Sequence, residues 1–126
     1  MYTNNQNESD EAHRRWGQTQ AYKIAAQRTQ SYTPTDWKRI KLEARAIYQG
    51  FQQSQTLSLA DDEVKRWVDA WQHHIDQYYY PCDDQMLCHL ADLYEQDVRY
   101  VKNIDKVGGE GTAQRMIEAI RYCRSR

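Results

Sequence analysis

The sequence lacks an excess of charge of either sign. Its 126 residues include 17 Lys and Arg against 18 Asp and Glu, which gives a formal net charge of −1. A domain that binds nucleic acid on its own carries a basic surface, because contacts with the phosphate backbone dominate its affinity. The balanced composition therefore excludes the electrostatic pattern of an independent nucleic-acid-binding domain.

Long apolar runs are also missing. No stretch reaches the roughly 20 apolar residues of a membrane-spanning helix, and no basic segment followed by an apolar one opens the chain. The three cysteines, Cys82, Cys88 and Cys123, are an odd number without the spacing of a disulfide framework, so we expect free thiols. These absences favour the cytoplasm, and the length favours one domain.

Phenylalanine is scarce, whereas tyrosine is abundant: the chain has one Phe, ten Tyr and four Trp. Three of the tyrosines, residues 78–80, are consecutive and lead through Pro81 to Cys82. Pro81 disfavours helical geometry at Tyr80, so a helix should end there and present the Tyr80 ring to a ligand. The alternative is that these tyrosines pack in a core and Cys82 is an unreactive small residue.

No segment alternates polar and apolar residues with period two, so we predict an all-helical chain. The clearest helix start is Thr33-Pro34-Thr35-Asp36, with Thr33 as N-cap, Pro34 at the first position and Asp36 at the third. The later helices are expected after a cap signature at Ser58 to Asp61, from about Asp83, within 97–106, and from about Thr112 to Arg124.

The N-terminal third has little apolar surface. Its large apolar side chains between residues 11 and 30 are Trp16, Tyr22 and Ile24. Docking such a segment gains little against the ordering cost of about 1–2 kcal/mol per residue. We therefore predict a disordered lead-in over 1–10 and a domain over 11–126, divided into a marginal, lid-like arm over 11–30 and a helical core over 33–124. A permanently packed arm is the alternative.

Several motifs together resemble one family. In chain order they are Arg15-Trp16-Gly17-Gln18-Thr19-Gln20-Ala21-Tyr22, then Tyr32 to Trp37, then Ile75 with Tyr79, Cys82 and Met86, then Leu90 to Tyr94 with Asp97, Arg99 and Tyr100, and finally Glu118-Ala119-Ile120. Over residues 11 to 123 the chain is similar to the TipAS antibiotic-recognition domain, the effector-binding half of MerR-type transcription activators. The resemblance implies a single-domain, globin-like helical bundle around a deep ligand cleft.

The resemblance also implies a ligand class: large, flat, partly cyclic peptide or aryl antibiotics such as thiopeptides and albicidin. The expected function is ligand sensing for a MerR-type regulator, with a DNA-binding half upstream in a longer product and no direct nucleic-acid binding by this chain. One alternative is a standalone protein that confers resistance by sequestering the drug. Another is a scaffold that recruits a protein partner through the same groove.

The expected ligand-binding residues combine the aromatic segment with the family positions; they are Cys82, Tyr80, Tyr79, Trp71, His74, Met86, Trp16 and Tyr22. The resemblance implies that the thiol at the position of Cys82 attacks a dehydroalanine of a thiopeptide. A helix N-terminus lowers the pKa of a thiol, whereas Asp83 and Asp84 raise it, so we expect modest activation. Family position gives Trp16 and Tyr22 the role of a lid.

No catalytic site, metal site or cofactor is expected. The adjacent pairs His73-His74 and Cys88-His89 would direct their side chains to different sides of a helix, which disfavours a shared metal ion. No His or Asp is spaced to act as a base for Cys82, so a hydrolase is a weak alternative.

Overall fold

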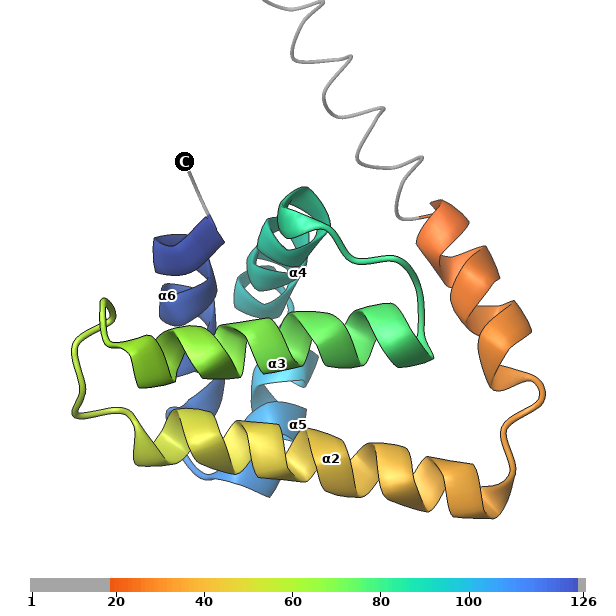
Figure 1. Cartoon of the computed structure of the whole chain (residues 1–126), viewed down its shortest axis with the longest axis horizontal. Coiled ribbons are helices and arrows are strands. Elements are labelled where there is room, and N and C mark those ends of the chain that lie inside the picture. The colour runs from red at the N-terminus through yellow and green to blue at the C-terminus, as the bar shows by residue number, and fades with distance from the viewer. Residues whose placement is uncertain (1–18, 125–126) are drawn as a thin grey trace, which may run out of the picture.

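Helices make up most of residues 19–124, the part of the chain that the computed structural model describes (Figure 1). Residues 19–29 are helical, and five helices follow: α2 (Pro34–Gln53), α3 (Asp62–Tyr78), α4 (Asp84–Gln96), α5 (Val98–Gly108) and α6 (Thr112–Arg124). No strand occurs in these residues, so the all-helical prediction is confirmed for them. The predicted lead-in over 1–10 and the first part of the arm, 11–18, lie outside the described residues.

The starts of α2 to α5 are each fixed by a short side chain that accepts a backbone hydrogen bond. At α2, Thr33 is the N-cap as expected: Asp36 N donates to Thr33 Oγ1 at 3.1 Å, and Thr33 N donates to Asp36 Oδ2 at 2.9 Å, which completes a capping box. Asp61 rather than Ser58 caps α3, since Glu63 N donates to Asp61 Oδ1 at 2.9 Å. Ser58 instead accepts from Ala60 N within the preceding loop.

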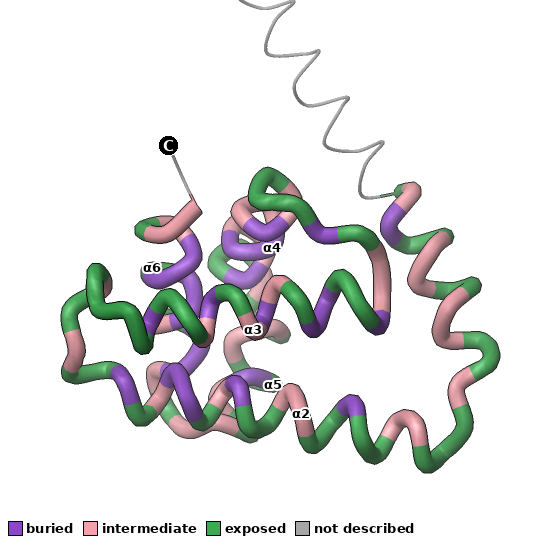
Figure 2. The backbone as a smooth tube through the Cα atoms, viewed as in Figure 1, coloured by how far each residue is buried: buried purple, intermediate pink, exposed green. Residues whose placement is uncertain are grey.

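The core lies between the inner faces of α2 to α6 (Figure 2). Helices α2 and α3 run side by side, and α4 packs against α6 behind them. Fully buried side chains at helical spacing fill the interior; they include Phe51, Val64, Val68, Leu87, Met116, Ile117 and Ile120. None of the helices in residues 19–124 is both long enough and apolar enough to cross a membrane.

The segment 19–29 lies apart from this core, beside the C-terminal end of α3 (Figure 1). Two hydrogen bonds to backbone carbonyls at the end of α3 hold this region: Arg28 Nη1 donates to Asp76 O at 2.6 Å, and Tyr32 OH donates to Tyr78 O at 2.6 Å. Few hydrogen bonds therefore hold this segment. Side chains from several elements line the space between it, α3 and α4.

Gly50 allows α2 and α3 to approach closely, because a Cβ at this position would overlap the indole ring of Trp67. Alanine in a helix is normally favoured over glycine by about 0.5–1 kcal/mol, but overpacking costs about 1–3 kcal/mol. We therefore expect Gly50→Ala to lower the free energy of unfolding by about 1–2 kcal/mol, measured by urea denaturation. The matched control is Gln49→Ala, an exposed position on the same helix, which should be neutral or slightly stabilising. A Gly50→Ala protein as stable as the wild type would contradict this account of the contact.

Candidate ligand-binding site

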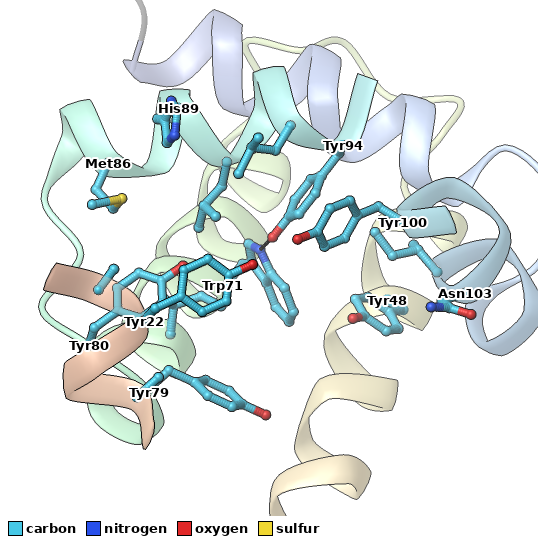
Figure 3. A pocket seen from close by; sticks show the side chains of 16 residues that line it. Tyr22, Tyr48, Trp71, Tyr79, Tyr80, Met86, His89, Tyr94, Tyr100 and Asn103 are labelled. Atoms are coloured by element: carbon cyan, nitrogen blue, oxygen red, sulfur yellow. Dashed lines mark hydrogen bonds between the residues drawn. The ribbon is translucent and has the colours of Figure 1, made fainter. Parts of the chain in front are cut away.

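A cavity of about 410 Å³ opens between the segment 19–29, α2, the C-terminal half of α3, α4 and α5 (Figure 3). Seven aromatic side chains line it: Tyr22, Tyr48, Trp71, Tyr79, Tyr80, Tyr94 and Tyr100. The other lining residues are apolar except for His89 and Asn103; they are Ala21, Ala25, Ile75, Met86, His89, Leu90, Leu93, Asn103 and Ile104. No Asp, Glu, Lys or Arg of the described residues lines the cavity, whose volume is within the roughly 300–1,000 Å³ of small-molecule sites.

Trp71 forms the inner wall of the cavity and is held by contacts from three helices. Its Nε1 donates to Tyr94 OH at 3.2 Å (dashed in Figure 3), and its indole lies 5.2 Å, centroid to centroid, from the ring of Tyr48. The His74 imidazole stacks on it at 5.3 Å with an interplanar angle of 13°. Because α2, α3 and α4 all contribute, the position of this wall is set by the fold.

His74, expected at the ligand, lies outside the lining and behind Trp71. Only 1% of it is exposed, and its Nδ1 lies 3.1 Å from Glu43 Oε1. Tyr78 OH donates to the other oxygen of the same carboxylate at 3.0 Å. The apolar spacing of α3 indicated that His74 lies beside the buried face of the helix. In the structure its side chain is directed toward Glu43 of α2. Its contacts are therefore those of a group that supports the wall.

Tyr79 and Tyr80 come from the connection between α3 and α4, which is fixed by hydrogen bonds. Tyr80 N donates to Ile75 O at 3.1 Å, and Cys82 N donates to Asp76 Oδ1 at 2.9 Å. From the α3 side, Gln72 Nε2 donates to Cys82 O at 3.1 Å. This network places both tyrosine rings on the cavity; the helix end before Pro81 indicated only Tyr80, and helical spacing alone favoured a core position for Tyr79.

The cavity offers hydroxyl groups that the described residues leave without a hydrogen-bond partner. No hydrogen bond within residues 19–124 involves the hydroxyls of Tyr22, Tyr48, Tyr79, Tyr80 and Tyr100, and the buried Nε2 of His89 has no partner there either. Burial, with Tyr79 nearby, raises the pKa of Tyr48 to about 12, and burial also raises the pKa of Tyr80. Both phenols therefore remain protonated near neutral pH and are able to donate to a ligand.

The N-terminal helical segment covers one side of the cavity with three side chains, Ala21, Tyr22 and Ala25. Ala21 is buried, whereas 66% of Tyr22 is exposed. The Tyr22 ring therefore keeps a large free face although it borders the cavity. Trp16, the other residue expected in the lid, lies outside the described residues.

Cys82 lies in the connection between α3 and α4; it is buried and does not line the aromatic cavity. It borders a smaller hollow of about 260 Å³, together with Asp69, Gln72, His73 and Asp76. Burial comes first among the causes that raise the pKa of its thiol to about 12, followed by the carboxylates of Asp83, Asp76 and Asp84. The expectation of modest activation is therefore wrong: burial and three carboxylates outweigh the helix N-terminus.

Five of the eight expected residues lie together at the cavity: Tyr22, Trp71, Tyr79, Tyr80 and Met86. Sequence reasoning missed the contributions of α2 and α5, which are Tyr48, Tyr100, Asn103 and Ile104, and those of α4 beyond Met86. A signal for α4 was present, because Met86, His89, Leu90 and Leu93 follow the spacing of one helix face. Nothing local indicated that Tyr48 and Tyr100 face the same space.

The fold and the cavity define a helical ligand-binding domain. Over residues 9–123 the chain matches the TipAS antibiotic-recognition domain, and it belongs to that family. The family is one of ligand-binding recognition domains and not a class of enzymes. No group of three or more His, Cys, Asp or Glu in residues 19–124 is arranged to hold a metal ion.

Two transcription regulators are similar in sequence. The HTH-type transcriptional activator TipA of Streptomyces coelicolor is 33% identical over 118 residues, which cover 88% of this chain and 44% of that protein. The HTH-type transcriptional activator mta of Bacillus subtilis is 34% identical over 97 residues, which cover 76% of this chain and 37% of that protein. The chain thus spans less than half the length of these relatives.

A solved structure, TipAS of Streptomyces lividans in complex with nosiheptide, has a TM-score of 0.69 and 25% sequence identity to this chain. The match covers 93% of this chain and 86% of the other. The predicted globin-like helical fold is confirmed by this similarity.

The buried Cys82 thiol should react slowly with an alkylating reagent. With its pKa at about 12, the thiolate fraction at about pH 8 is on the order of one in ten thousand. We expect iodoacetamide to modify Cys82 at least about tenfold more slowly than Cys88 and Cys123, which are half-buried, as followed by peptide mapping. In urea the three cysteines should react alike. Preferential alkylation of Cys82 in the folded protein would contradict the burial described here.

Proposed function

We propose that this chain recognises large, partly aromatic antibiotics in the cavity and serves as the ligand-sensing domain of a MerR-type transcription regulator. The observation that carries the proposal is a cavity walled by Trp71 and six tyrosines, with no Asp, Glu, Lys or Arg among its described lining residues, in a member of the antibiotic-recognition family. The complex of the Streptomyces lividans relative with nosiheptide supports a thiopeptide as a ligand. The two longer relatives, both activators, support a DNA-binding half in the full protein.

The aromatic wall supplies most of the affinity in this proposal. Flat rings of a ligand bury apolar area against Trp71, Tyr79 and Tyr80, and each well-placed aromatic pair adds about 0.5–1.5 kcal/mol beyond the area term. The free hydroxyls then select ligands with acceptors at matching positions, because an unmatched polar group would be buried without a partner. A wall of this kind accepts related flat molecules while it still sets their orientation.

Binding in this cavity is reversible in our proposal. Cys82 is the only cysteine next to the aromatic segment, but its thiol lies outside the cavity lining, and its raised pKa keeps it protonated. Attack on a dehydroalanine requires a thiolate held close to the electrophile. Attachment at Cys82 would therefore require the connection between α3 and α4 to rearrange.

The segment 19–29 acts as the lid in this proposal. It contributes Ala21, Tyr22 and Ala25 to the cavity but buries little apolar surface of its own. A ligand in the cavity supplies the missing contact surface for the free face of Tyr22. Closing the lid on the ligand is then the change that a regulator transmits to its DNA-binding half.

The contribution of the Tyr80 ring is tested by calorimetric titration with nosiheptide. We expect Tyr80→Ala to raise Kd at least about tenfold because it removes a ring from the cavity wall. Tyr80→Phe should retain most of the affinity. The control is Tyr122→Ala on α6, which removes an exposed ring outside the cavity. Absence of binding to the wild type would contradict the thiopeptide class, and equal weakening by Tyr122→Ala would contradict the site.

The lid is tested by hydrogen exchange with and without nosiheptide. Amides of residues 19–29 should exchange faster than those of α2 in the free protein, because few contacts hold this segment, and slow down in the complex. The interior of α6 is the internal control and should change little. If residues 19–29 of the free protein are as protected as α2, the cavity is preformed and the lid proposal is wrong.

A further inference from the structure

A second hollow, of about 700 Å³, shares Tyr48 and Tyr79 with the aromatic cavity. We call it the basic groove; it is lined by Lys38, Ile40, Lys41, Leu42, Ala44, Arg45, Tyr48, Tyr79, Lys106 and Val107. Its residues come from α2, from the C-terminal end of α5 and from the connection after α3. Because Tyr48 and Tyr79 border both spaces, the groove continues the aromatic cavity past these two rings.

The basic groove has cations and no carboxylate among its lining residues. Lys38, Lys41 and Arg45 lie at spacings of three and four along α2, so they share one helix face, and Lys106 approaches from α5. None of these four side chains takes part in an ion pair within the described residues. Their positive charge is therefore not neutralised locally.

The nearest acidic side chains of the same helices have other partners. Glu43 on α2 contacts His74 and Tyr78. Asp36, at the start of α2, pairs with Arg39. Asp105 on α5 accepts from the backbone N–H groups of Gly111 and Ala113. These contacts keep all three carboxylates away from the groove.

The lining of the groove is also partly apolar. Leu42 and Val107, which are 56% and 44% exposed, line it together with the cations. A purely ionic surface for nucleic acid does not need such apolar residues, and the chain has a net charge of −1. Apolar residues beside cations suit the end of a mostly apolar molecule that carries a negative group.

We propose that the ligand of the aromatic cavity extends past Tyr48 and Tyr79 and places an anionic group in the basic groove. This inference rests on the proposed function and predicts that elongated aromatic molecules with an acidic end, such as a carboxylate or a sulfonate, bind more tightly than neutral ones of the same shape. The neutral cavity binds the rings, and the groove selects for the charge. The two spaces together thus distinguish acidic ligands from neutral ones of the same shape.

A matched pair of fluorescent probes tests the inference. The dye 8-anilinonaphthalene-1-sulfonate carries an acidic group, and N-phenyl-1-naphthylamine is the same molecule without the sulfonate. Both are titrated against the full chain, against Lys41→Gln/Arg45→Gln, and against Lys65→Gln/Arg66→Gln. The last variant removes the same number of exposed charges from α3, outside both spaces. Tyr80→Ala reports on the aromatic cavity.

We expect Lys41→Gln/Arg45→Gln to raise Kd for the sulfonate at least about fivefold and to change Kd for the neutral probe by less than about twofold. Lys65→Gln/Arg66→Gln should change Kd for neither probe by more than about twofold. Equal weakening of the sulfonate by both charge variants, or no weakening by the groove variant, would overturn the inference. If the neutral probe binds and Tyr80→Ala weakens it, the proposed function stands even then. If neither probe binds the wild type, the inference is overturned, whereas the proposed function is decided by the titration with nosiheptide.

Discussion

The anchoring of Trp71 is the interaction on which the rest of the site depends. The indole donates to Tyr94 on α4, stacks on His74 from its own helix and meets Tyr48 on α2. One side chain therefore joins the packing of three helices to the inner wall of the cavity. The Glu43 carboxylate extends this support, since it contacts both His74 and Tyr78. Loss of these contacts would disturb the packing of the core and the shape of the cavity together, because the same rings belong to both.

The second constraint is the separation of uncharged and charged surface around Tyr48 and Tyr79. The aromatic cavity has no Asp, Glu, Lys or Arg among its described lining residues, whereas the basic groove is lined by four cations and by apolar residues. Keeping charge out of the aromatic cavity avoids the desolvation penalty that a buried, unpaired ion would impose on an apolar ligand. Charge in the exposed basic groove adds discrimination between acidic and neutral ligands. Its desolvation cost is small because solvent still reaches the charged groups.

Local signals in the sequence predicted the helices well, whereas the site was predicted only in part. Thr33 is the N-cap of α2 as expected, because it and its partner Asp36 lie within four residues. Tyr80 lies at the cavity, where the helix end before Pro81 indicated it, and Tyr79 lies there beside it. Tyr48 and Tyr100 were missed, since only the packing of α2 and α5 brings them to the same cavity. His74 contacts Glu43 of α2 and Cys82 borders the smaller hollow, because each position is set by contacts between elements that helical periodicity does not give.

The most direct test of the account is to locate a bound ligand by NMR, through contacts between the aromatic protons of nosiheptide and methyl groups of the protein. Methyl groups of Met86, Ile75 and Ile104 line the cavity from three different helices, whereas those of Ile117 and Ile120 are buried in α6. The account predicts nuclear Overhauser contacts from the ligand to the first three and none to the α6 pair. Saturable binding without contacts to Met86, Ile75 and Ile104 would contradict the claim that the aromatic cavity is the recognition site.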